Sequence, residues 1–134
     1  MKTFELEPGM VTLRGVFYPT GWMFLMFASE QEARDAERLL EDDGLPGDEA
    51  CLLSPQDIQE KLARTVGNAD TPLPSAGTES DTVRQFTELA SQGHWALMVH
   101  APSREQTDHV MDVLKDSKIT HGQKYRHLVI EDLA

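Results

Sequence analysis

The stretch Gly21–Ser29, which reads GWMFLMFAS, decides the fold of this chain. A glycine precedes six consecutive large apolar residues, and a serine that suits the start of a helix follows them. Because successive side chains of a strand point to opposite faces, both faces of this run would be apolar and both would need covering. A buried helix is the alternative, but six residues make a short helix, and Ser29 begins one of its own. We therefore predict a central strand over residues 22–28.

The length of 134 residues suits a single domain, 1–134, that is large enough to bury a core. No apolar run is long enough to cross a bilayer, and the N-terminus lacks the apolar segment of a signal peptide. The lone cysteine, Cys51, fits a reducing compartment. We therefore expect a cytoplasmic protein that does not associate with a membrane.

The chain is acidic, with a formal net charge of −11. This charge disfavours binding to nucleic acids, which relies on clustered lysine and arginine residues. Many of the carboxylates lie in residues 30–49, where they indicate either a solvated helix face or a docking face for a basic partner.

Capping and turn residues predict the order of the elements. Four helices are predicted to begin at Ser29, Ser54, Thr78 and Ser103, and glycines should end the first three at Gly44, Gly67 and Gly93. Besides the central strand, strands are predicted over residues 10–18, 50–53, 94–100 and about 124–130. The first of these should form a hairpin with the central strand. Residues 1–9 should form a loose arm, and residues 67–77 a flexible loop.

An internal repeat indicates how these elements combine. An offset of 74 residues places Leu25 on Val99, Ser29 on Ser103, and Leu40 on Leu114. Each half then reads strand, helix, strand, which predicts an α+β fold of the ferredoxin-like type: two βαβ halves in one mixed or antiparallel sheet. Two extra helices are inserted between the halves. The repeated helices should pack on one face, so either the inserted helices or a second subunit must cover the other, and we predict a homodimer.

The paired segments Trp22–Leu40 and Trp95–Leu114, together with Leu128–Leu133, resemble small bacterial proteins of the general-stress and uncharacterised ferredoxin-like kind. The resemblance covers about half of the chain. It implies a fold and a location rather than an activity, because no catalytic motif of such families carries over to these residues.

The spacing of the histidines argues against a metal site. His94 and His100 would lie on one face of one strand, about 20 Å apart, whereas zinc ligands lie about 2 Å from the ion. The same distance separates His121 from His127 if their strand is continuous. The chain also lacks the HxxxH, HExxH and CxxC patterns. We predict no metal and no cofactor, and we interpret these histidines as strand-end residues.

Two groups of residues are candidates for ligand binding. Ser75, Gly77 and Thr78 lead into a helix whose N-terminus could hold a small anion with help from an arginine; the alternative is a plain capped helix. Tyr18 and Tyr125 could flank a polar pocket if the first and last strands are neighbours; the alternative is surface decoration of edge strands. The candidate residues are Arg14, Tyr18, Ser75, Gly77, Thr78, His94, His100, Tyr125 and His127.

No pairing of a nucleophile with a base is visible, since the conspicuous serines are explained as helix caps. We therefore expect a non-catalytic binding or regulatory module, stress-related by resemblance, that takes a small anionic ligand or a protein partner. The alternative is a small-molecule enzyme that uses His94, His100 or His127 as an acid–base group in a pocket beside the sheet. A purely structural oligomer is a third interpretation.

Overall fold

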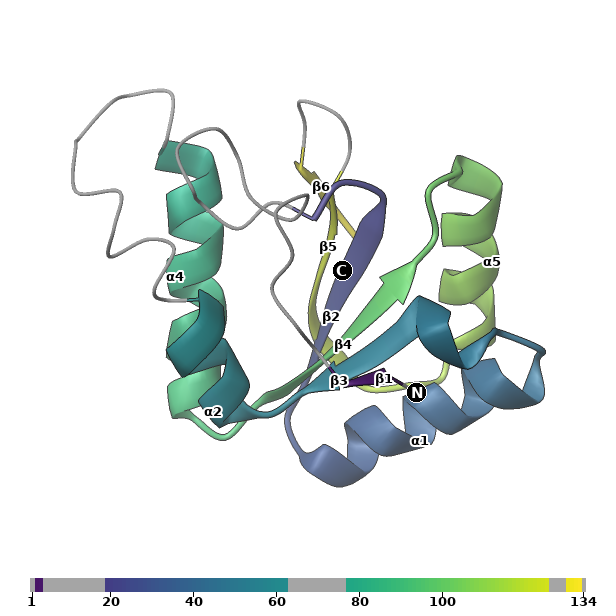
Figure 1. Cartoon of the computed structure of the whole chain (residues 1–134), viewed down its shortest axis with the longest axis horizontal. Coiled ribbons are helices and arrows are strands. Elements are labelled where there is room, and N and C mark those ends of the chain that lie inside the picture. The colour runs from purple at the N-terminus through teal and green to yellow at the C-terminus, as the bar shows by residue number, and fades with distance from the viewer. Residues whose placement is uncertain (1, 4–18, 63–76, 126–129, 134) are drawn as a thin grey trace.

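The computed structural model describes residues 2–3, 19–62, 77–125 and 130–133. They form an α+β fold in which helices flank both faces of one six-stranded sheet (Figure 1). The strands, in chain order, are β1 (Lys2–Thr3), β2 (Trp22–Phe27), β3 (Ala50–Leu53), β4 (Trp95–His100), β5 (Ile119–Tyr125) and β6 (Ile130–Asp132). The helices are α1 (Glu30–Asp42), η2 (Gly47–Glu49), α2 (Pro55–Asp57), η3 (Ile58–Leu62), α4 (Gly77–Ser91) and α5 (Arg104–Val113).

The strands lie in the order β1-β3-β4-β2-β5-β6. Strand β2 is antiparallel to β4 on one side and to β5 on the other, and β4 is antiparallel to β3. The unit β2-α1-β3 therefore has β4 inserted between its strands, and β4-α5-β5 has β2 inserted. The two strand–helix–strand halves expected from the repeat are present, and each interleaves with the other.

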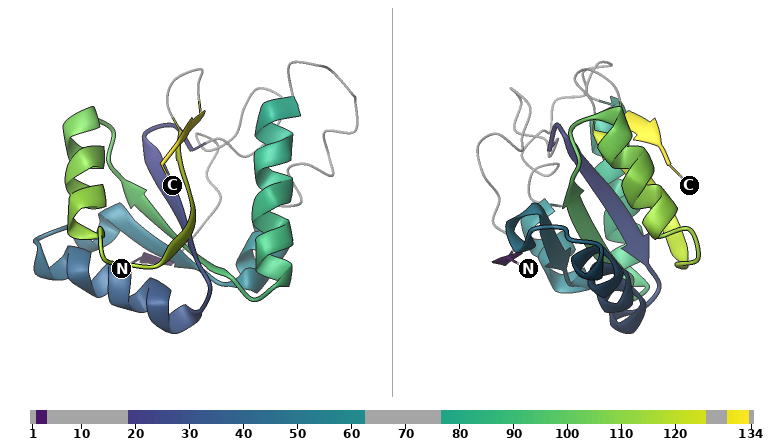
Figure 2. Two further views of the ribbon diagram at one scale, coloured as in Figure 1. Left: turned by 180° about the vertical axis from the view of Figure 1, so that it is seen from behind. Right: turned by 90° about the vertical axis from the view of Figure 1, so that its right-hand side faces the viewer.

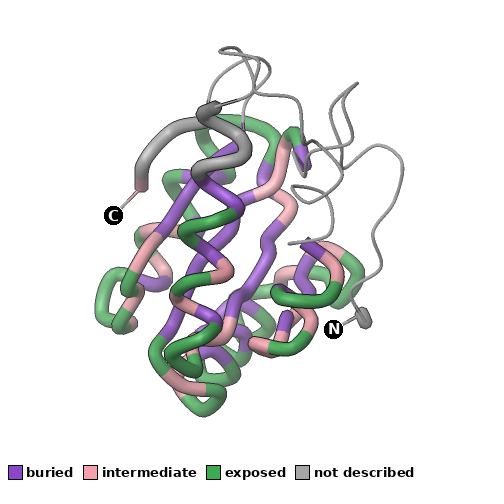
Figure 3. The backbone as a smooth tube through the Cα atoms, turned by 90° about the vertical axis from the view of Figure 1, so that its left-hand side faces the viewer, coloured by how far each residue is buried: buried purple, intermediate pink, exposed green. Residues whose placement is uncertain are grey.

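Strand β2 is central and buried on both faces, as its sequence predicts. The five residues Met23–Phe27 have no exposed surface. Phe24 and Met26 belong to one apolar core, and Met23, Leu25 and Phe27 to the other. Each core is enclosed between the sheet and a separate set of helices, so buried residues follow the strands while exposed residues lie on the outer sides of the helices (Figure 3).

The two faces of the sheet are covered by different parts of the chain. Helices α1 and α5 cover the face of Leu25, as the repeat predicts. Helices α2, η3 and α4 cover the face of Phe24, whose ring stacks on Phe86 of α4 with centroids 4.1 Å apart. The sequence allowed either the inserted helices or a second subunit to cover this face, and in the structure the inserted helices cover it. The predicted homodimer loses that reason and stays a prediction.

The caps predicted at Ser29, Ser54 and Ser103 are present. The Ser29 hydroxyl accepts a hydrogen bond from the Glu32 amide at 3.2 Å, and complete capping boxes occur at Ser54 and Ser103. Helix α1 ends before Gly44, and Gly93 follows α4; both glycines adopt the left-handed conformation, with φ near +99° and +92°. Helix α4 begins at Gly77, one residue before its predicted start.

The last strand differs from the prediction over residues 124–130. Strand β5 begins at Ile119 and ends at Tyr125, and a separate strand, β6, follows at Ile130–Asp132. The sequence ITHGQKY hides this strand because its polar groups find partners within the sheet, where the Thr120 hydroxyl donates to the Met26 carbonyl. Apolar patterning alone detects only strands whose faces are apolar.

The N-terminal arm is attached to the sheet over two residues. Lys2 and Thr3 form β1, which pairs in parallel with Cys51 and Leu52 of β3. The rest of the arm predicted for residues 1–9, the strand predicted over 10–18 and residues 67–76 of the predicted loop lie outside the described residues.

Candidate functional site

A pocket of about 340 Å³ lies between the end of α1 and the first half of α5. This volume falls in the range of cavities that hold small organic ligands. Both helices lie on the same face of the sheet (Figure 2), and the end of β4 closes the pocket at its inner side. We refer to it as the α1–α5 pocket.

The wall of the pocket on the α1 side is formed by a helix-ending turn. The amide of Leu45 donates to the Leu40 carbonyl, and the amide of Gly44 donates to the Glu41 carbonyl, each at 3.0 Å. These two bonds, with the left-handed Gly44, constitute a Schellman motif. The motif turns the chain back sharply, so that Leu40 and Leu45 both line the pocket.

The wall on the α5 side is fixed by the capping box of that helix. The Ser103 hydroxyl accepts from the Gln106 amide, and the Gln106 side-chain oxygen accepts from the Ser103 amide, both at 3.0 Å. This cap sets the first turn of α5 and presents Glu105, His109 and Val110 to the pocket.

The pocket has an apolar interior and a polar rim. Its apolar residues are Leu40, Leu45, Pro46, Ala101 and Val110, and its polar side chains include Asp43, Glu49, Glu105, Gln106 and His109. Three of the apolar residues are buried members of the core, whereas the rim side chains are exposed or half-buried. This combination is typical of ligand sites, in which apolar contact supplies affinity and a few polar groups supply orientation.

Asp43 and His109 form a pair across the rim. Nε2 of His109 lies 2.5 Å from Oδ2 of Asp43, with the two side chains 60% and 40% exposed. The carboxylate can hold the imidazole in one orientation, as carboxylates do for histidines that transfer protons. At this exposure the pair contributes little stability, so its consequence is the position of the imidazole over the pocket.

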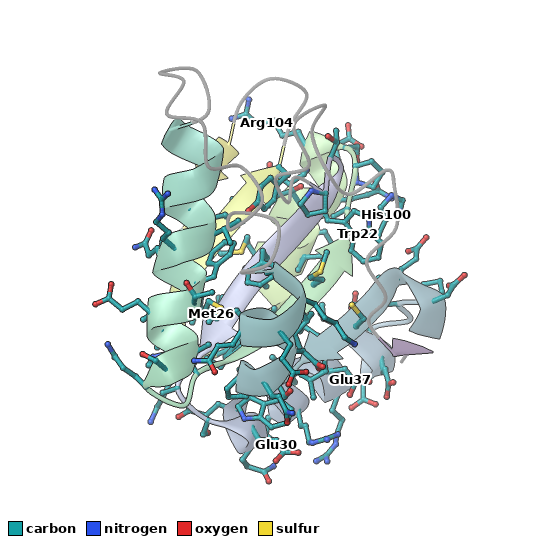
Figure 4. The ribbon with its side chains drawn as sticks, turned by 60° about the vertical axis from the view of Figure 1, so that its left-hand side comes forward. Trp22, Met26, Glu30, Glu37, His100 and Arg104 are labelled. Atoms are coloured by element: carbon teal, nitrogen blue, oxygen red, sulfur yellow. The ribbon has the colours of Figure 1, made fainter. Side chains whose placement is uncertain are left out.

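The sequence-predicted histidines lie at opposite ends of β4. His94 precedes the strand, whereas His100 ends it and packs against Trp22 with ring centroids 5.0 Å apart (Figure 4). Tyr125 is buried at the same end of the sheet, where its carbonyl accepts from the Gly21 amide at 2.8 Å. The fold therefore brings His100 and Tyr125 to either side of β2 and leaves His94 apart. Of these three residues, His100 is the one that lines the α1–α5 pocket.

The other candidates are placed only in part. Gly77 and Thr78 form the first residues of α4. Arg14, Tyr18, Ser75 and His127 lie outside the described residues. Among the residues that the structure describes, no group of three or more histidine, cysteine, aspartate or glutamate side chains is arranged to hold a metal ion.

Sequence reasoning missed the Asp43–His109 pair and a buried lysine. Asp43 and His109 are 66 positions apart, and each alone looks like an exposed helix residue. Lys124 is only 1% exposed, and its ammonium group donates to the Ala101 carbonyl and to the Thr107 hydroxyl, each at 2.6 Å. Because Ala101 also lines the pocket, the hydrogen bond from Lys124 helps to hold this part of the lining in place.

Burial perturbs one carboxyl on α1. Desolvation raises the pKa of Glu37 above its ordinary value. The hydrogen bond that protonated Glu37 donates to the Glu41 carboxylate, and the negative charge of Glu41, raise this pKa further. Arg34 opposes this with a smaller lowering effect. Glu37 does not line the pocket, so we interpret it as a proton-binding group of the helix (Figure 4).

Comparisons of the chain with protein-family models, with curated proteins and with solved structures gave no match. In the described part of the chain, no helix has the length and apolarity needed to cross a membrane.

Proposed function

We propose that this protein is a non-catalytic binding module whose small-molecule ligand occupies the α1–α5 pocket. The observation that carries the proposal is the pocket itself: about 340 Å³ with an apolar interior and a polar rim. Its walls come from two capped helices and the end of β4, so little order has to be gained when a ligand binds.

The chemistry of the lining favours binding over catalysis. None of the described residues that line the pocket carries a hydroxyl, a thiol or an amine, the groups that most often act as nucleophiles. The polar side chains that remain are suited to hydrogen bonding and charge pairing with a ligand.

Filling the pocket tests this function. Leu45→Trp places a large ring in the cavity, whereas Leu39→Trp adds the same ring at an exposed position of α1 as a matched control. A ligand found by a thermal-shift screen of small metabolites should lose its affinity for the first variant and keep it for the second. Equal affinity for both variants would place the ligand elsewhere and contradict the proposal.

The second candidate function is an enzyme that uses His109 as its acid–base group. The 2.5 Å contact with Asp43 favours this alternative, because a carboxylate on one ring nitrogen leaves the other available for proton transfer. Its histidine differs from the three that the sequence suggested. An enzyme should lose turnover in His109→Gln while keeping its affinity for the substrate; a binding module should produce no product in either form.

We also propose the ferredoxin-like fold, on the support of the strand order β3-β4-β2-β5 and its two interleaved halves. The cytoplasmic location, the homodimer and the bacterial stress-related setting are proposals that rest on composition and resemblance. Light scattering tests the dimer, which requires a mass of about twice the 15.0 kDa of one chain.

A further inference from the structure

We infer that the ligand of the α1–α5 pocket is an organic cation: a protonated amine or guanidinium group on an apolar stem. The inference rests on the proposed function and names the class of ligand. It requires that both the charge and the apolar interior of the pocket be used by one molecule.

The charge of the rim selects a cation. Asp43, Glu49 and Glu105 come from three different elements or turns and converge on one cavity, and no lysine or arginine is among its described lining residues. Three carboxylates around a partly closed cavity make the electrostatic potential inside it more negative, which favours the binding of a positive group.

The end of α1 adds to this preference. The C-terminal end of a helix carries partial negative charge, so a cation near it is stabilised. Yet α1 ends in Glu41, Asp42 and Asp43, and its last turn contains no basic residue. A cation bound beside Asp43 would offset both the carboxylates and the helix dipole.

His109 indicates how a cation would be held. Its Nε2 already contacts one oxygen of Asp43 at 2.5 Å. A carboxylate can accept several hydrogen bonds, so the second oxygen is chemically able to receive an N–H donor of the ligand. The ammonium group would then share Asp43 with the imidazole or displace it.

The apolar interior of the pocket makes a bare metal ion a poor match for it. Leu40, Leu45 and Val110 offer apolar surface, which gains from burying carbon and gives nothing to a hydrated ion. An alkyl or aryl stem beneath an ammonium group matches both parts of the cavity. Such a group can belong to a free amine or to a lysine side chain of a peptide.

Three probes of equal length test the class. Calorimetric titration should detect binding of hexylamine. The affinity for hexanol should be about tenfold weaker or more, and hexanoate should show no binding. Hexanol or hexanoate that binds as well as hexylamine would overturn the cation while leaving the proposed function intact. If none of the three probes binds, the inference is overturned as well; the metabolite screen on Leu45→Trp then decides the proposed function separately.

Matched variants locate the effect. Glu49→Gln with Glu105→Gln keeps the shape of the rim and removes two charges, so hexylamine affinity should fall at least tenfold, and less at high salt. Glu88→Gln, on the exposed side of α4, is the control and should change nothing. An unchanged affinity in the double variant would overturn the inference.

A capped tripeptide with a central lysine separates the two sources of the cation. Tighter binding than that of hexylamine favours a protein partner, and weaker binding favours a free amine.

Discussion

Nε2 of His109 on α5 lies 2.5 Å from Oδ2 of Asp43, the residue that caps the end of α1. The two residues are 66 positions apart, and their contact links the two helices that form the walls of the pocket. The pair is more important for the geometry of the site than for stability, because both side chains remain partly exposed to water.

The first prediction concerns this pair. Replacing His109 by Gln should lower the free energy of unfolding by no more than about 1 kcal/mol, since exposed ion pairs contribute about 0–1 kcal/mol. Urea unfolding of the variant, with Asp43→Asn as its partner, measures the change. A loss of several kcal/mol would instead make the pair a structural link between the helices.

The second prediction concerns the buried ammonium of Lys124. Lys124→Met shortens the unbranched side chain by only one heavy atom and removes the donors to Ala101 and Thr107, so that the buried carbonyl loses a charged partner. Such changes cost about 1–3 kcal/mol, which chemical denaturation should detect. The exposed Lys118→Met serves as the control and should be near neutral. Equal stability of the two variants would contradict the structural role of Lys124.

How much of this fold follows from the sequence depends on the kind of signal each element carries. The run at residues 22–27 predicts its strand because both faces are apolar, and Ser54 and Ser103 predict helix starts because a cap is a local interaction. Strand β5 escaped prediction because its polar residues are satisfied by distant partners. Periodicity shows that a face is apolar but not which element covers it, so the role of α4 stayed open.

The candidate site was less predictable than the fold. A pocket forms where a helix end meets the start of another, and no local pattern joins Asp43 to His109 across 66 positions. Of the histidines chosen for their chemistry, His100 lines the pocket, whereas His94 lies at the opposite end of the same strand. Local signals therefore predict elements, whereas the site depends on their packing.

The third prediction tests the cover of the second sheet face. Phe86→Ala removes the ring that stacks on Phe24 and leaves a cavity between α4 and the sheet, which should cost about 3–5 kcal/mol. Phe86→Leu, which keeps most of the volume, should cost clearly less. Guanidinium denaturation gives both values. A small loss in Phe86→Ala would mean that α4 is not the cover that stabilises this face.

The fourth prediction follows from the raised pKa of Glu37. A carboxyl whose pKa is higher in the folded state than in the unfolded state binds protons more tightly when folded. Stability therefore falls as pH rises from the unfolded pKa, about 4.5, through the folded one. Glu37→Gln resembles the protonated form and should therefore stabilise the protein at pH 7, with a gain that shrinks at more acidic pH. Unfolding curves at pH 7 and at a more acidic pH measure the gain in stability. Glu88→Gln is the exposed control, and a gain for Glu37→Gln that does not vary with pH would exclude the titration as its cause.

The fifth prediction separates the shape of the pocket from the stability of the fold. Gly44 has φ near +99°, and a Cβ added there would meet no atom within 4 Å. Gly44→Ala therefore introduces backbone strain without a clash, at a cost of about 1–2 kcal/mol, whereas Gly44→Asn should cost less because asparagine tolerates the left-handed conformation. This turn positions Leu45 at the pocket. If the strain unwinds the turn, Leu45 moves, and the affinity for hexylamine should fall more in the alanine variant than in the asparagine variant. Denaturation and calorimetry on the same samples measure the two effects. Lower stability with unchanged affinity in the alanine variant would contradict this prediction, because the turn would then keep its conformation despite the strain.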